Sequence, residues 1–143
     1  MCNCRKPMRL HNRRLHKAYT YSDSIRFLTF EKRFIEMGII RKKMLNDLKN
    51  RLKSRFSDNL KDVVLFGSQI NSKAHKDSDY DILIVLKQKV DWKAEREISD
   101  ICFEIDLKYN IITDTHILSE EELSTLRGKQ PIFVNALSNG LYV

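Results

Sequence analysis

The chain has 143 residues, of which 42% are hydrophobic and 31% charged, so it can bury the core of one domain but leaves no room for a second full domain. Its longest unbroken apolar run, Ile82–Leu86, is far shorter than the roughly 20 residues that span a bilayer, which argues against a membrane protein. The basic N-terminus lacks an apolar signal segment, and the three cysteines lack the spacing of a disulfide scaffold or zinc site. We therefore expect a cytoplasmic protein.

Charge is distributed unevenly along the chain. Residues 1–61 carry 17 Lys and Arg against 5 Asp and Glu, a net charge of +12, whereas residues 62–143 carry 9 against 14, a net charge of −5. The stretch Met1–Tyr21 is polar and basic and has no clear period, which is typical of a poorly ordered segment. We expect a basic, poorly ordered extension over residues 1–36 and a folded domain over residues 37–143.

The first predicted element is a helix over Met37–Phe56. Apolar residues recur there at three- and four-residue steps and the lysines fall largely on the other side, as in a helix that packs on a core. The run Asp62–Phe66 is short, apolar and rich in β-branched residues, so we expect a buried strand. Gly67 and Ser68 end this strand, and a polar stretch follows as far as Ser78.

Two further strands flank a long helix in the second half of the chain. Tyr80–Leu86 is predicted to be a buried strand because its residues are mostly β-branched or apolar. Asp91–Tyr109 has helical spacing of its apolar residues, and Asp91 is a suitable N-cap. Ile111–Leu118 again mixes β-branched and apolar residues, which predicts the third strand.

The C-terminal part is predicted to be helical. Ser119 and Glu122 have the spacing of a capping box, which opens a short helix that ends near Arg127. Pro131 begins a last helix, and Gly140 ends it. The order of elements predicts a small α+β domain with α/β character, in which a short sheet is backed by helices.

Two features in the middle of the chain suggest chemistry. A strand that ends in Gly67-Ser68 permits a sharp turn and close approach of a ligand, and a helix that follows such a turn can present free N–H groups to a phosphate. Asp79 and Asp81 lie two residues apart at the start of a strand, so both carboxylates point to the same face. Such a pair is tolerable in water, as in a solvated turn, or with a hard cation such as Mg²⁺ between its members.

Together these features form a recognisable motif. Gly67-Ser68, followed about ten residues later by Ser78-Asp79-Tyr80-Asp81 and an apolar strand, resembles the signature of the polymerase-β-like nucleotidyltransferase superfamily. The chain is most similar to the minimal nucleotidyltransferases, the MNT proteins that are paired with HEPN-domain toxins. The resemblance implies a small mixed sheet with helices mainly on one face, the nucleotidyltransferase fold. It also implies that Gly67, Ser68 and Ser78 bind the nucleotide triphosphate and that Asp79 and Asp81 bind Mg²⁺.

The family also places a third carboxylate on a neighbouring strand. Asp114 lies on the predicted strand after the long helix, where the family pattern has this residue, so we expect Asp79, Asp81 and Asp114 to form the catalytic and metal-binding set with two ions. Asp106 is the rival candidate, but the helical spacing around it makes it a residue on the helix surface. His116 is expected to pack within the strand rather than to bind a ligand.

The loop between the two halves of the motif departs from the family. Asn71 and Ser72 stand where members often have an arginine and a glycine. We therefore expect phosphate binding to be weaker than in those members, or to be provided instead by Gln69, Lys73 or Lys76.

Three functions are compatible with this motif. The first is Mg²⁺-dependent transfer of a nucleoside monophosphate to an acceptor hydroxyl with release of pyrophosphate. Here the resemblance implies ATP as the donor and a HEPN-type toxin as the acceptor, which would make the chain an antitoxin. The second is an antitoxin that acts by binding its partner without catalysis, which the altered loop favours. The third is transfer to a nucleic acid or a small molecule, supported only by the basic N-terminal half.

Overall fold

The computed structural model describes residues 21–70 and 78–143. The chain divides into two units, Met1–Arg33 and Phe34–Val143, and helix α1 (Tyr21–Phe56) crosses their boundary. This helix begins earlier than the expected start at Met37, and no proline or glycine interrupts the sequence between Tyr21 and Met37. Of the extension over residues 1–36 that was expected to be poorly ordered, residues 21–36 are helical and residues 1–20 lie outside the described residues. The domain boundary near residue 36 stays a prediction. None of the described helices is both long enough and apolar enough to cross a membrane.

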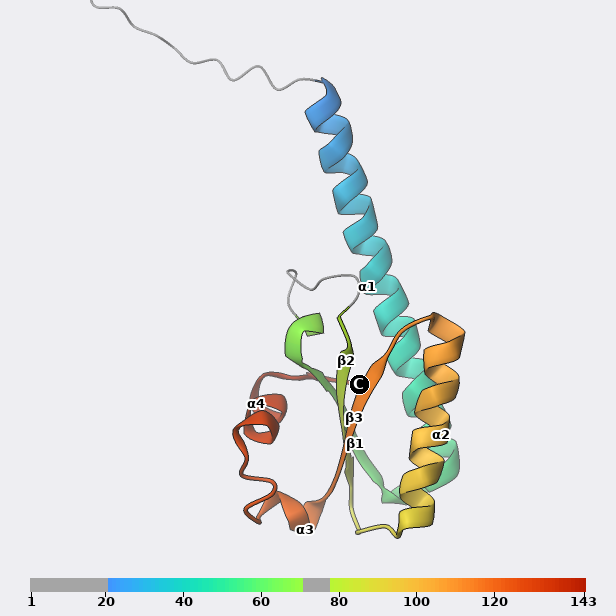
Figure 1. The fold of residues 1–143 in the computed structure, drawn as a ribbon, viewed down its shortest axis with the longest axis vertical. Coiled ribbons are helices and arrows are strands. Elements are labelled where there is room, and N and C mark those ends of the chain that lie inside the picture. Colours follow the sequence, from blue (N-terminus) through green and yellow to red (C-terminus); the bar gives the residue numbers. More distant parts are fainter. Residues whose placement is uncertain (1–20, 71–77) are drawn as a thin grey trace, which may run out of the picture. The chain divides into compact units, whose positions relative to one another are not determined.

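The second unit is built on a four-stranded mixed sheet (Figure 1). Its strands are β1 (Leu60–Phe66), β2 (Tyr80–Leu86), β3 (Thr113–Ser119) and β4 (Leu141–Tyr142), in the order β3-β2-β1-β4. β1 is antiparallel to both β2 and β4, whereas β2 and β3 are parallel. The mixed sheet confirms the predicted fold class, and β2 has the bounds that the sequence predicts.

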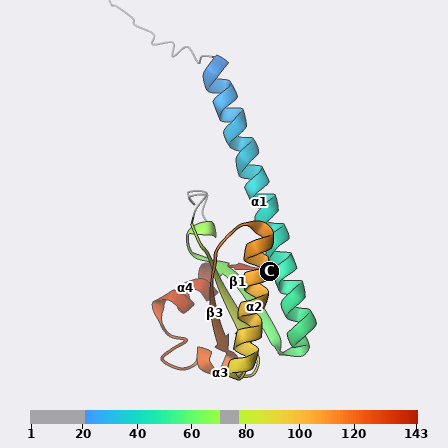
Figure 2. The same ribbon diagram turned by 45° about the vertical axis from the view of Figure 1, so that its right-hand side comes forward.

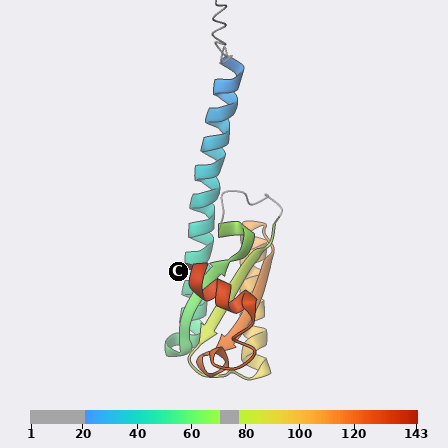
Figure 3. The same ribbon diagram turned by 90° about the vertical axis from the view of Figure 1, so that its left-hand side faces the viewer.

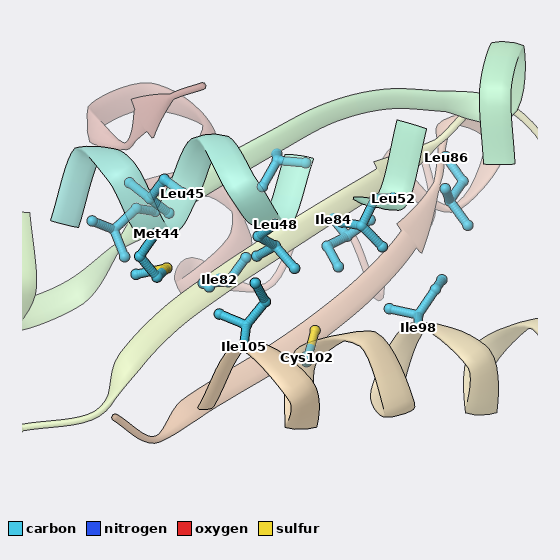
Figure 4. Packing of buried hydrophobic residues seen from close by; sticks show 12 residues of the cluster. Met44, Leu45, Leu48, Leu52, Ile82, Ile84, Leu86, Ile98, Cys102 and Ile105 are labelled. Atoms are coloured by element: carbon cyan, nitrogen blue, oxygen red, sulfur yellow. The ribbon is translucent and has the colours of Figure 1, made fainter. Parts of the chain in front are cut away.

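The two long helices cover one face of the sheet. The second half of α1 and helix α2 (Trp92–Tyr109) lie side by side on this face (Figures 1 and 2) and are joined by ion pairs such as Arg55–Glu97. Leu48 of α1, Ile84 of β2 and Cys102 of α2 meet in the buried core between the helices and the sheet (Figure 4). Asp91 caps α2 as predicted, since its carboxylate accepts a hydrogen bond of 3.0 Å from the Ala94 N–H.

The shorter helices lie on the other side. Helix α3 (Glu120–Leu123) begins with the predicted capping box but ends before Arg127. Helix α4 (Pro131–Asn139) begins at Pro131 as expected and lies across the sheet (Figure 3). Its Phe133 and Ala136 pack on a second cluster of alternate strand residues: Val64, Phe66, Leu83, Val85 and Leu118. The helices are therefore mainly, but not wholly, on one face.

Gly140 ends α4, although not in the left-handed conformation that a helix-terminal glycine often adopts, since its φ is −72°. A Cβ at this position would lie 2.2 Å from the Ala136 carbonyl oxygen and 2.3 Å from Cγ1 of Val64. The residue must therefore be glycine because the chain passes close to β1, where Leu141 and Tyr142 then form β4.

Candidate active site

The site is arranged around the turn that follows β1. Gly67 has a φ of +75° and opens a 3-10 helix over Gly67–Ile70, with Ser68 exposed at the turn. A Cβ on Gly67 would lie 1.9 Å from Oδ2 of Asp81. Only glycine meets both requirements, because it adopts the left-handed conformation without strain and leaves room for the neighbouring carboxylate.

Two carboxylates lie on adjacent strands beside this turn, and a third lies just before one of them. Asp81 of β2 is the register partner of Asp114 on β3 and of Phe66 on β1. Asp81 alternates with Leu83, so its side chain points to the face that α4 covers, and Asp114 shares this face with Leu118. Asp79 is exposed just before β2 begins. The structure thus brings together the two ends of the sequence motif and Asp114.

The negative charges at this site affect one another. Burial raises the pKa of Asp81, and the nearby carboxylates of Asp114 and Asp79 raise it further, while His116 opposes them. Within residues 21–70 and 78–143, no three His, Cys, Asp or Glu side chains already stand as a complete set of metal ligands. The donor chemistry fits a hard cation, because carboxylate oxygens are the ligands that Mg²⁺ takes and a cation would relieve this repulsion.

His116 lies on the same face of β3 as Asp114. Its ring lies between the rings of Phe66 and Phe133, at centroid distances of 5.9 Å and 5.6 Å. The packing that the sequence predicts for His116 is present, but its Nε2 atom also lies 3.6 Å from Oδ2 of Asp114. Sequence reasoning did not connect this histidine with the carboxylates.

Gln69 joins the two halves of the motif in a way that the sequence did not indicate. Its side chain is 2% exposed, and its Nε2 donates a hydrogen bond of 2.7 Å to the Ser78 carbonyl oxygen. The guanidinium group of Arg41, on α1, donates to the Gln69 carbonyl oxygen. These contacts tie the turn after β1 to the chain just before Asp79. The Gln69 side chain is buried and one of its two N–H donors is used by the Ser78 carbonyl oxygen, so its observed contact is structural.

Asp106 has a different environment from Asp114. One carboxylate oxygen of Asp106 accepts a hydrogen bond of 3.3 Å from the Thr113 N–H, so this residue holds the connection from α2 into β3. It is partly buried rather than on the free helix surface that the spacing predicted. Asn71, Ser72, Lys73 and Lys76, on which the altered phosphate grip was expected to depend, lie outside the described residues.

Comparison with known proteins identifies relatives of the domain. Residues 45–137 match the model of the nucleotidyltransferase domain family. Two proteins of Methanocaldococcus jannaschii, each named "Putative protein adenylyltransferase", are similar. One is 33% identical over 79 residues, which cover 55% of this chain and 74% of the relative. The other is 30% identical over 69 residues, which cover 48% and 70%.

A crystal structure of a mutant of the toxin–antitoxin pair MntA-HpeT was also found, with a TM-score of 0.43 and 17% identity over 64% of this chain and 66% of that one. The family match spans more than half of the chain and includes the Gly67 turn and all three carboxylates. The chain is therefore a nucleotidyltransferase, a member of the nucleotidyltransferase domain family.

Proposed function

We propose that the protein transfers AMP from ATP to a hydroxyl group of a partner protein, with Mg²⁺ bound by Asp79, Asp81 and Asp114. The observation that carries this proposal is the meeting of Asp81 and Asp114 on paired strands, beside a turn whose glycine leaves space for the Asp81 carboxylate. Three carboxylates beside a Gly-Ser turn suit a reaction in which positioning and charge neutralisation matter more than covalent catalysis.

Each residue has a defined task in this reaction. Gly67 and Ser68 offer backbone and hydroxyl donors to the terminal phosphates, and Ser78 stands at the edge of the same site. The acceptor oxygen forms a bond to the α-phosphorus, the bond to the bridging oxygen breaks, and pyrophosphate leaves. Asp114 takes the acceptor's proton. Bound Mg²⁺ would neutralise the triphosphate and lower the pKa of the acceptor hydroxyl.

The donor and the acceptor are proposed on different grounds. The two archaeal relatives, at 33% and 30% identity, are named as protein adenylyltransferases, which supports ATP and a protein hydroxyl. The motif's resemblance to the minimal nucleotidyltransferases supports a HEPN-type toxin as the partner, and hence an antitoxin role.

The decisive experiment uses ATP labelled at the α-phosphate, Mg²⁺ and the product of the neighbouring gene as the candidate toxin. We expect the toxin to become labelled, and no label to be transferred from ATP labelled at the γ-phosphate. Asp79→Asn/Asp81→Asn should abolish transfer. Asp100→Asn, a change at an exposed position on α2, is the matched control and should leave it intact. Transfer that persists in the double variant would place the chemistry elsewhere.

The same variants separate catalysis from neutralisation by binding alone. If Asp79→Asn/Asp81→Asn folds but no longer protects cells from the toxin, the catalytic proposal is supported. If this variant still protects fully, the protein acts as an antitoxin by binding, and the carboxylates serve another purpose. Label transferred to RNA instead of to the toxin would point to a nucleic-acid acceptor, and binding to that RNA should then weaken steeply with salt.

A further inference from the structure

The position of His116 is set by two aromatic rings. The Phe66 ring, at the end of β1, is tilted by 38° to the imidazole, and the Phe133 ring of α4 meets it edge-on at 76°. Phe66 and Phe133 are themselves buried, with 4% and 6% of their surface exposed. The imidazole can therefore rotate little, and the directions of its two nitrogen atoms are fixed by packing.

One of these nitrogens lies near the carboxylate of Asp114. Nε2 of His116 is buried and has no hydrogen-bond partner among the residues that the structure describes. Its nearest acidic atom is Oδ2 of Asp114 at 3.6 Å, slightly too far for a hydrogen bond. A buried ring nitrogen without a partner costs free energy, so its retention here calls for an explanation.

Asp114 can close this gap. Its side chain is 59% exposed, compared with 28% for His116, so the carboxylate can turn while the imidazole stays in place. Asp114 and His116 are two residues apart on β3 and therefore share a face. A small rotation of the carboxylate brings Oδ2 within hydrogen-bond distance of Nε2, and its other oxygen remains available to a ligand.

We propose that His116 is a positioning residue, which donates a hydrogen bond from Nε2 to Asp114 and holds that carboxylate in its working orientation. This inference rests on the proposed function, since it assigns Asp114 to the reaction. Residues that orient a ligating or basic carboxylate in this way typically change activity by about 10- to 100-fold when they are removed. Packing alone would not require a nitrogen at this position, because phenylalanine would fill the same space between Phe66 and Phe133.

The test compares two substitutions that separate the ring from its nitrogen. His116→Phe keeps the aromatic packing and removes the donor, whereas His116→Gln keeps a donor and removes the ring. We expect His116→Phe to lower kcat by about 10- to 100-fold with little change in KM for ATP, and His116→Gln to recover part of this loss. In an Asp114→Asn background, His116→Phe should cost less than about twofold, because the two residues act as one unit.

A second readout does not depend on catalysis. Titration with Mn²⁺, followed by electron paramagnetic resonance, should show weaker binding in His116→Phe than in the wild type. If His116→Phe retains wild-type kcat and Mn²⁺ affinity, or if its loss is equally large without the Asp114 carboxylate, the positioning role is wrong. If the wild type transfers no label but Mn²⁺ affinity still falls with His116→Phe, the proposed reaction fails and the positioning role stands.

Discussion

The Asp81 carboxylate occupies the space that a side chain at residue 67 would need. A Cβ on Gly67 would lie 1.9 Å from its Oδ2 and 2.8 Å from its Cγ, although the two residues are 14 positions apart in the chain. The glycine of the motif thus has two functions: it turns the chain with a φ of +75°, and it makes room for the carboxylate. This close approach means that the side chain at residue 67 and the position of the Asp81 carboxylate cannot be changed independently.

Gly67→Ala should therefore damage the site more than the fold. The left-handed backbone costs alanine about 1–2 kcal/mol, and Asp81 must move to admit the methyl group. We expect transfer activity to fall strongly. In urea denaturation, the free energy of unfolding should fall only by about the 1–2 kcal/mol that the left-handed backbone costs. Gly38→Ala is the control, because a Cβ on Gly38 meets nothing within 4 Å and alanine favours the helix by up to about 1 kcal/mol. Equal activity in the two variants would argue against a catalytic role for this turn.

Gln69→Leu tests the link between the turn and the aspartates. The substitution keeps a side chain in the buried site but removes the 2.7 Å hydrogen bond to the Ser78 carbonyl oxygen. An unpaired buried carbonyl costs about 1–3 kcal/mol, so urea denaturation should show a loss of that order. ATP binding, measured by calorimetry, should weaken because Ser78 and Asp79 lose their support.

Gln88→Leu provides the control for that substitution. Gln88 is exposed after β2, so Gln88→Leu should change the free energy of unfolding by no more than about 0.5 kcal/mol. If Gln69→Leu binds ATP as well as Gln88→Leu does, the bond from Gln69 to Ser78 serves stability alone.

Sequence patterns predicted the elements whose signals are local. The apolar run of β2, the N-cap Asp91 and the capping box at Ser119 lie where expected, because each depends on residues within one turn or strand. β4 was missed because two residues carry no periodic signal, and Leu141 and Tyr142 form a strand only through pairing with β1.

The missed features of the site are also non-local. Gln69 has its partner nine residues away across a loop, so a polar residue in a turn gave no sign of its buried bond to Ser78. His116 has its environment defined by Phe66 and Phe133, which come from β1 and α4. The motif and the family pattern pointed to the three carboxylates, whereas no signal in the sequence pointed to the residues that contact the motif.

The raised pKa of Asp81 predicts a pH-dependent effect on stability. Burial and the carboxylates of Asp114 and Asp79 disfavour its charge in the folded state, so ionisation opposes folding as the pH rises through that pKa. Without divalent cations, Asp81→Asn should therefore be more stable than the wild type at pH 7. This advantage should disappear as the pH falls below about 4, where Asp81 is protonated in both folded and unfolded chains. Thermal melts of both proteins between about pH 4 and pH 7 measure this difference in stability.

Glu122 provides the opposite case. The Ser119 N–H donates to its carboxylate at 2.9 Å and lowers its pKa, so the ionised form stabilises the fold above the unfolded-state pKa. Glu122→Gln should be less stable than the wild type at pH 7, and the difference should shrink as the pH falls through the lowered pKa. The same sign for both variants would show that the pH effect does not come from these local environments.

Divalent cations should stabilise the folded protein through the three carboxylates. At ten times its Kd, a bound ion adds about 1.4 kcal/mol to the free energy of unfolding, which a thermal melt detects as a higher Tm. Mg²⁺ should raise the Tm of the wild type, excess EDTA should reverse the rise, and Asp81→Asn should lose it. Asp100→Asn should keep it, because this exposed aspartate lies on α2. NaCl at matched ionic strength is needed for comparison, since screening also weakens repulsion between carboxylates. A rise in Tm that is equal in Asp81→Asn and the wild type would mean that the ions bind elsewhere.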